Sequence, residues 1–123
     1  MQQFQMSKLK PGSYIHMIGI GGISMSALAH MLLDFGYRVS GSDLKDSNLT
    51  DDLRARGAKI FLGQSADHIT NPDVVCYTAA IAATNPELQK ARTLGVPVIE
   101  RAELLGMIET FQQARGAGML PSL

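Results

Sequence analysis

Short apolar runs alternate with longer segments of helical spacing along this sequence. Residues 14–20 alternate as a buried strand does and end in a cluster of glycines. The next segment places four apolar residues at the i, i+3, i+4, i+7 spacing of one helix face: Leu28, Met31, Leu32 and Phe35. The pattern predicts a strand over residues 14–20 and a helix over residues 24–35, with Gly36 as its C-terminal cap.

The same alternation continues toward the end of the chain. Further strands are predicted over residues 38–43, 59–62, 73–78 and 96–99, and further helices over residues 48–56, 84–94 and from 101 onward. The start of the helix in the 84–94 segment is the most clearly marked, because Asn85 can cap it, Pro86 fits its first turn and Glu87 faces its dipole.

Strands and helices that alternate through short connections form parallel sheets with right-handed crossovers. We therefore predict an α/β, Rossmann-like three-layer domain with a five-stranded parallel sheet in the order 3-2-1-4-5. This domain is expected to span residues 1–111, and residues 112–123 are expected to be a flexible or truncated tail. Such a sheet binds ligands beyond the carboxyl ends of its strands, where the strand order reverses.

Composition excludes several classes of function. Hydrophobic residues make up 46% of the 123 residues and charged residues 18%, which is typical of a globular protein. Eleven basic residues balance eleven acidic ones, so bulk charge argues against nucleic-acid binding. Cys76 is the single cysteine and cannot form an internal disulfide, which favours a reducing, cytoplasmic location.

One uncharged stretch, residues 11–33, superficially resembles a signal peptide or a membrane span. His16, His30 and the glycine cluster interrupt the continuous apolar surface that a membrane segment requires. We therefore expect no membrane association.

The segment Gly19-Ile20-Gly21-Gly22 is the most informative for chemistry, because it lies between a predicted strand and a predicted helix. Backbone amides without side chains, together with the positive end of a helix dipole, can bind a diphosphate without lysine or arginine. The alternative is a tight turn that binds nothing. Ser24 occupies the third glycine position of a dinucleotide-binding fingerprint, which is expected to lengthen the gap between helix and strand.

Two further loops are candidates for the same site. Asp43 lies 22 residues beyond Gly21, close to the spacing of an acid that binds ribose hydroxyls; the alternative is an aspartate that caps a turn. Residues 78–81 combine a hydroxyl with small side chains and could line the ligand or form an ordinary strand exit. His16 is interpreted as a core histidine. His30 and His68 lack partners at metal-ligand spacing, so no metal site is predicted.

Three segments, residues 15–26, 39–43 and 101–105, resemble the N-terminal domain of the UDP-N-acetylmuramate–L-alanine ligases of the Mur ligase family. The resemblance runs from about Tyr14 to Ile108. It implies a three-domain, ATP- and magnesium-dependent amide ligase of cytoplasmic peptidoglycan synthesis, whose first domain binds the UDP part of UDP-N-acetylmuramate.

The resemblance also implies roles for individual residues. The diphosphate would bind Gly19, Ile20, Gly21, Gly22, Ile23 and Ser24. Ser42 and Asp43 would approach the uridine, and the same cleft would be lined by Thr78, Ala79, Ala80 and Ile81.

The ATP-binding phosphate loop of the family, G-x-x-x-x-G-K-[ST], does not occur in this sequence. We therefore expect no catalytic residue and no cofactor in this chain. ATP and magnesium would belong to a parent ligase whose central and C-terminal domains are absent here, and the chain alone is expected to be inactive. Two other functions remain open: an NAD-binding domain of an oxidoreductase, and a non-catalytic regulatory or interaction module. The Gly21-Gly22 pair and the segments 42–43 and 101–103 favour the ligase.

Overall fold

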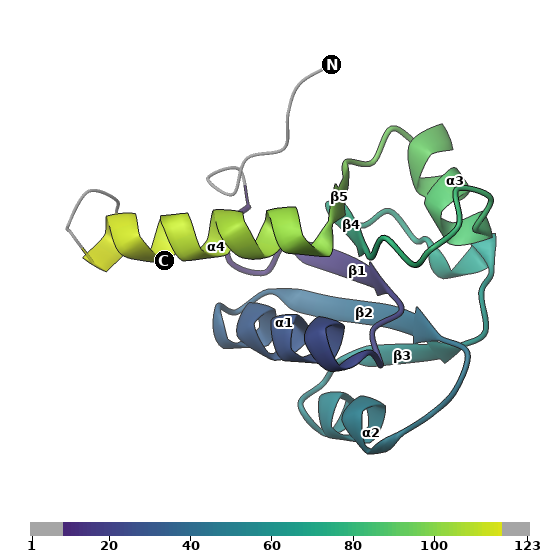
Figure 1. Cartoon of the computed structure of the whole chain (residues 1–123), viewed down its shortest axis with the longest axis horizontal. Coiled ribbons are helices and arrows are strands. Elements are labelled where there is room, and N and C mark those ends of the chain that lie inside the picture. The colour runs from purple at the N-terminus through teal and green to yellow at the C-terminus, as the bar shows by residue number, and fades with distance from the viewer. Residues whose placement is uncertain (1–8, 117–123) are drawn as a thin grey trace.

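The structure is a computed structural model that describes residues 9–116 (Figure 1). Its five parallel strands are β1 (Tyr14–Ile18), β2 (Arg38–Asp43), β3 (Lys59–Leu62), β4 (Val74–Tyr77) and β5 (Val98–Glu100). Its helices are α1 (Ile23–Asp34), α2 (Asn48–Ala55), the short 3-10 helix η2 (Ala66–His68), α3 (Pro86–Thr93) and α4 (Arg101–Gly116). The strand order β3-β2-β1-β4-β5 confirms the predicted Rossmann-like α/β fold.

Local chemistry explains where the elements differ from their predicted bounds. Strand β1 ends at Ile18 because Gly19 adopts a φ of +83°, which turns the chain out of the sheet. Strand β5 begins only at Val98, since Pro97 has no N–H to donate to the ladder. Helix η2 was not predicted, because three residues are too few to show a period; its N-cap is Ser65.

Helix α4 crosses the expected boundary between domain and tail. It extends to Gly116, so residues 112–116 continue a helix that begins at Arg101. The remainder of the expected tail, residues 117–123, lies outside the described residues. The division of the chain at residue 111 therefore stays a prediction.

The sheet is covered on both faces, and β1 shows how its side chains divide between them. Ile15 and Met17 belong to the larger apolar cluster, together with buried residues of α1, α2 and α4. Ile18 belongs to a smaller cluster, together with buried residues of α3. Successive strand residues point to opposite faces, so His16 lies on the α3 face with Ile18. Within residues 9–116, no helix has the length and apolar character needed to cross a membrane.

The carboxyl ends of the three strands β1, β2 and β3 meet at one edge of the sheet. In the ladders, Ile18 is paired with Ser42, and Asp43 is paired with Leu62. The loops that follow these strands, and the loop from β4 to α3, therefore leave the sheet at the same edge. This carboxyl edge is where a parallel sheet of this order places its ligands.

Candidate functional site

The glycine turn between β1 and α1, residues 19–22, is held in place by the end of β2. Gly19 and Ile20 both donate their N–H groups to the carbonyl oxygen of Ser42, over 2.8 and 3.0 Å. Gly22 donates to the carbonyl of Gly19 over 3.1 Å and serves as the N-cap of α1, without a side-chain cap. The carbonyl group of Ser42 thus holds the first two residues of the turn.

The amide of Gly21 also has a partner inside the domain. It donates to Oδ2 of Asp43 over 2.9 Å, and Oδ1 of the same carboxylate lies 3.4 Å from the amide of Lys45. A Cβ at Gly21 would lie only 2.8 Å from Oδ2 of Asp43. The spacing that singled out Asp43 therefore brings it to the glycine turn, and its approach to a uridine stays a prediction.

Three amides at the start of α1 remain for an anion. Within residues 9–116, the N–H groups of Ile23, Ser24 and Met25 donate to no protein acceptor, as is expected in the first turn of a helix. The first-turn amides and the helix dipole, equivalent to about half a positive charge, favour a negative group at this point. Of the residues 19–24 predicted to bind a diphosphate, only Ile23 and Ser24 have amides that are available, and Met25 adds a third.

Ser24 does not separate α1 from the sheet. Its side chain is exposed, whereas the next two residues, Met25 and Ser26, are buried. The expectation that a serine here widens the gap between helix and strand is therefore wrong, because the side chain points to solvent.

Ser42 and Asp43 point in opposite directions, as neighbours in a strand do. The Ser42 side chain is fully buried on the α3 face and donates to Oε1 of Glu87 over 2.8 Å. Asp43 faces the glycine turn. The structure therefore places the Asp43 side chain at the candidate site and the Ser42 side chain inside the domain, where only the Ser42 carbonyl serves the turn.

The loop after β4 lies beside the glycine turn. The amide of Ile81 donates to the carbonyl of Thr78 over 3.0 Å, which leaves Ala79 and Ala80 exposed at the bend. A Cβ at Gly19 would lie 3.8 Å from Cδ1 of Ile81. The predicted segments after β1, β2 and β4 are therefore neighbours at the carboxyl edge.

The carboxylate of Glu87 lies buried behind the carboxyl edge of the sheet. The sequence indicated only that this residue begins a helix. Glu87 is 0% exposed. Its Oε1 accepts from Nε2 of His16 over 2.6 Å and from Ser42, and its Oε2 accepts from Nδ1 of His68 over 2.9 Å and from the amide of Ser65 over 3.2 Å. Burial raises the pKa of Glu87, but the hydrogen bonds from His16, His68 and Ser42 outweigh it and hold the pKa below its usual value.

His16 is a buried histidine with both ring nitrogens hydrogen-bonded, as predicted. Its second ring nitrogen, Nδ1, lies 2.7 Å from Oγ of Ser40, which in turn lies 2.6 Å from the hydroxyl of Tyr14.

The sequence contained a signal for this buried polar cluster. Positions 40 and 42 share one face of a buried strand, and position 16 lies on the strand predicted beside it. Polar side chains at buried positions require buried partners.

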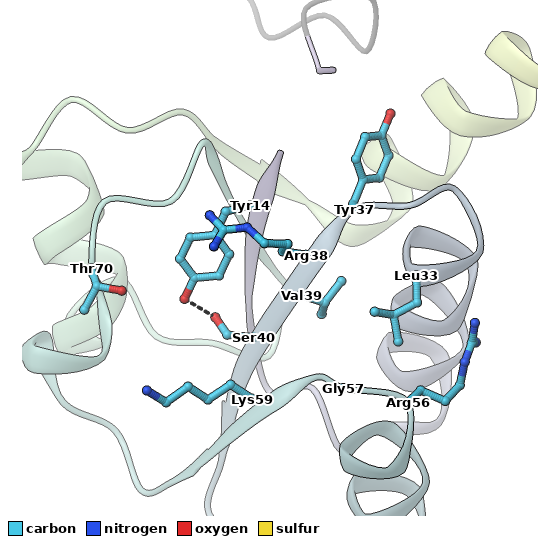
Figure 2. A pocket seen from close by; sticks show the side chains of 10 residues that line it. All are labelled: Tyr14, Leu33, Tyr37, Arg38, Val39, Ser40, Arg56, Gly57, Lys59 and Thr70. Atoms are coloured by element: carbon cyan, nitrogen blue, oxygen red, sulfur yellow. Dashed lines mark hydrogen bonds between the residues drawn. The ribbon is translucent and has the colours of Figure 1, made fainter. Parts of the chain in front are cut away.

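A cavity of about 480 Å³ lies at the opposite, amino-terminal edge of the sheet (Figure 2). Its lining residues are Tyr14, Leu33, Tyr37, Arg38, Val39, Ser40, Arg56, Gly57, Lys59 and Thr70. Arg38 lies over the ring of Tyr14, and Arg56 forms an ion pair with Asp34 over 2.6 Å. The cavity shares no residue with the predicted site. Within the described part of the chain, no group of three or more His, Cys, Asp or Glu side chains could hold a metal ion.

Comparison with known proteins gives a consistent result. Residues 14–112 match the family described as Mur ligase family, catalytic domain. A UDP-N-acetylmuramate–L-alanine ligase of Alkaliphilus metalliredigens is 59% identical over 95 residues, which cover 77% of this chain and 21% of that ligase. The corresponding ligase of Acetivibrio thermocellus is 52% identical over 106 residues, covering 85% of this chain and 23% of the ligase.

A solved structure agrees with these relatives. The UDP-N-acetylmuramate–alanine ligase MurC of Thermotoga maritima superimposes with a TM-score of 0.75 at 38% identity, covering 81% of this chain and 23% of that enzyme, in its N-terminal part. This chain therefore spans about a fifth to a quarter of the length of the relatives it matches. On this evidence the chain belongs to the Mur ligase family.

Proposed function

We propose that this chain binds the UDP part of UDP-N-acetylmuramate at the carboxyl edge of its sheet. It would do so as the N-terminal domain of an ATP-dependent ligase that adds L-alanine in cytoplasmic peptidoglycan synthesis. The observation that carries the proposal is the set of unpaired first-turn amides at residues 23–25, at the strand-to-helix turn of a chain whose relatives are named for this substrate.

The diphosphate is assigned to the first turn of α1. A hydrogen bond to a charged group contributes about 1.5–3 kcal/mol, so the three amides of Ile23, Ser24 and Met25 are enough to decide where the anion binds. Residues 19–22 supply the shape of the turn rather than its donors, since their own amides bond within the domain.

The negative charge of Asp43 gives the ligand a direction. Like charges repel most strongly at short range, so a phosphate next to Gly21 is unfavourable while the carboxylate is bonded there. The phosphates therefore bind toward Ser24, and the nucleoside lies toward Asp43. The carboxylate oxygens retain lone pairs that can accept hydrogen bonds from ribose hydroxyls. Residues 78–81 line the far side of the same edge.

ATP, magnesium and catalysis are assigned to parts of the ligase outside this chain. The sequence holds no ATP phosphate loop. The proposed site would hold the nucleotide part of the substrate rather than its reacting carboxylate. The chain is expected to bind its nucleotide-sugar without converting it. Binding is expected to be weaker than in an intact ligase, because contacts from the other domains are missing.

Calorimetry with three ligands tests the proposal. UDP and UDP-N-acetylmuramate are expected to bind, and NADH is not. Tighter binding of NADH than of UDP would favour the oxidoreductase alternative, and binding of none of the three would favour an interaction module. Amide chemical shifts add a local test, since the resonances of Ile23, Ser24 and Met25 are expected to move most on addition of UDP.

A further inference from the structure

Glu87 lies where the loops of the carboxyl edge converge, yet it does not reach the surface. It is the second residue of α3, and its carboxylate receives four hydrogen bonds from three other parts of the chain: β1, β2 and the segment from Ser65 to His68. A buried carboxylate with this many donors is fixed in position, because losing any of them would leave a buried polar group unpaired.

One branch from Glu87 leads directly to the glycine turn. Its Oε1 accepts from the hydroxyl of Ser42, and the carbonyl of that same serine accepts from the amides of Gly19 and Ile20. Ser42 thus connects the Glu87 carboxylate to Gly19 and Ile20, two residues of the turn. Displacement of the Ser42 backbone would move the carbonyl oxygen that accepts from Gly19 and Ile20.

A second branch joins the other loops of the edge. The Ser42 hydroxyl also lies 3.4 Å from Oε1 of Gln64, and Gln64 accepts from the side chain of Asn85 over 2.9 Å. Asn85 caps α3 and ends the loop that contains residues 78–81. On the other side, the ring of His68 stacks on Phe61 of β3 at 4.3 Å. The glycine turn after β1 and the loops after β3 and β4 are therefore connected to the same carboxylate.

We propose that Glu87 is a positioning residue for nucleotide binding, which acts through Ser42 to hold the glycine turn in its binding shape. The inference rests on the proposed function but names a residue that touches no ligand. Pre-organising the turn strengthens binding, because the free energy of ordering it is then not lost when the ligand arrives. In Glu87→Gln the amide NH2 replaces one carboxylate oxygen and must face the two donors of that oxygen, which loosens the contact to Ser42 or to His68.

Ser40 and Ser42 provide a matched pair of variants. Both serines are buried, both lie on the α3 face of β2, and both hydroxyls bond within the same cluster. Only Ser42 contacts Glu87 and accepts from the turn through its carbonyl. Ser40→Ala thus measures the effect of losing a buried hydroxyl. Ser42→Ala measures that effect together with the loss of the hydrogen bond between Ser42 and Glu87.

Two measurements test the proposal on the whole chain. In the unliganded protein, Glu87→Gln and Ser42→Ala are expected to shift the amide resonances of Gly19 and Ile20, and Ser40→Ala is expected to leave them in place. In calorimetry, Glu87→Gln is expected to weaken UDP-N-acetylmuramate binding about tenfold, which corresponds to about 1.4 kcal/mol, against less than about twofold for Ser40→Ala. The double variant Glu87→Gln/Ser42→Ala is expected to lose less than the two single losses combined.

The outcomes separate this inference from the proposed function. If Glu87→Gln lowers the melting temperature but leaves both the Gly19 and Ile20 resonances and the Kd unchanged, Glu87 is only a structural residue and the inference is overturned. If the wild-type chain does not bind UDP-N-acetylmuramate, the proposed function fails, and the resonance shifts alone decide whether Glu87 controls the turn. Should Glu87→Gln not fold, Ser42→Ala compared with Ser40→Ala decides by the same two measurements.

Discussion

The Asp43 carboxylate accepts a 2.9 Å hydrogen bond from the amide of Gly21, so the acid at the end of β2 closes the turn that precedes α1. This contact changes the expected use of the glycine turn. The Gly21 amide is already bonded, and a negative charge lies beside it, so we expect the diphosphate of the proposed ligand at the first turn of α1 rather than at Gly21. On the proposed function, the ribose is expected on the side of the Asp43 carboxylate, because its hydroxyls are neutral donors.

Gly21 and Gly22 are expected to differ in their tolerance of a side chain. A Cβ at Gly21 would lie 2.8 Å from Oδ2 of Asp43 and 3.1 Å from Cγ2 of Thr50, whereas a Cβ at Gly22 would approach nothing closer than 3.5 Å. Gly21→Ala is expected to displace Asp43, to lower the free energy of unfolding by about 1–3 kcal/mol and to weaken UDP binding. Gly22→Ala is expected to change stability by less than about 1 kcal/mol. Urea unfolding measures both, and equal losses would contradict the contact.

Asp43 is expected to affect nucleoside and phosphate binding in opposite directions. Asp43→Ala removes an acceptor for ribose hydroxyls, so UDP binding weakens. The same change removes a negative charge and releases the Gly21 amide, so free pyrophosphate binds as well as before or more tightly. Calorimetry with the two ligands checks this. Equal losses for both would mean that Asp43 serves only the shape of the turn.

The pKa of Glu87 makes a specific contribution to the pH dependence of folding. Because its pKa is lowered in the folded state, the unfolded chain takes up the proton more readily, near the ordinary value of about 4.3. The resulting stability is fully present above that value and is lost as pH falls toward the folded-state pKa. Urea unfolding between pH 7 and pH 3 is expected to show a shallower acid dependence for Glu87→Gln than for the wild type. If the free energies of unfolding of the two proteins fall in parallel with pH, other carboxylates account for the loss of stability in acid.

Cys76 is expected to be unreactive in the folded protein. Burial on β4, reinforced by the nearby charge of Glu100, raises the pKa of its thiol to about 12. Thiolate is the reactive form, so labelling by a thiol reagent at pH 8 is expected to be slow in buffer and complete in concentrated urea. Similar rates under both conditions would show that β4 opens readily.

The sequence predicted the elements and their order because periodicity is a local property. It also predicted that Asp43 lies at the carboxyl edge near Gly21, since the spacing of these two residues follows from one strand-helix-strand unit. Glu87 was placed at a helix start but not recognised as buried, because its partners His16 and His68 come from distant parts of the chain. The opposite directions of Ser42 and Asp43 were predictable in principle, since adjacent residues of a strand face opposite sides.

Gly41 lies where β2 passes close to the glycine turn, and a side chain is not expected to fit there. A Cβ there would lie 2.5 Å from Cβ of Ile20 and 2.7 Å from the carbonyl oxygen of Met17, so β2 passes the glycine turn too closely for any larger residue. Gly41→Ala is expected to cost about 2 kcal/mol or more, because backbone and Cβ atoms must move. Gly106, inside α4, is the matched control: its Cβ would meet nothing within 4 Å, and Gly106→Ala is expected to stabilise the protein by up to about 1 kcal/mol. The melting temperatures of the two variants are expected to shift in opposite directions. An unchanged melting temperature for Gly41→Ala would mean that the turn packs less closely against β2 than in the structure.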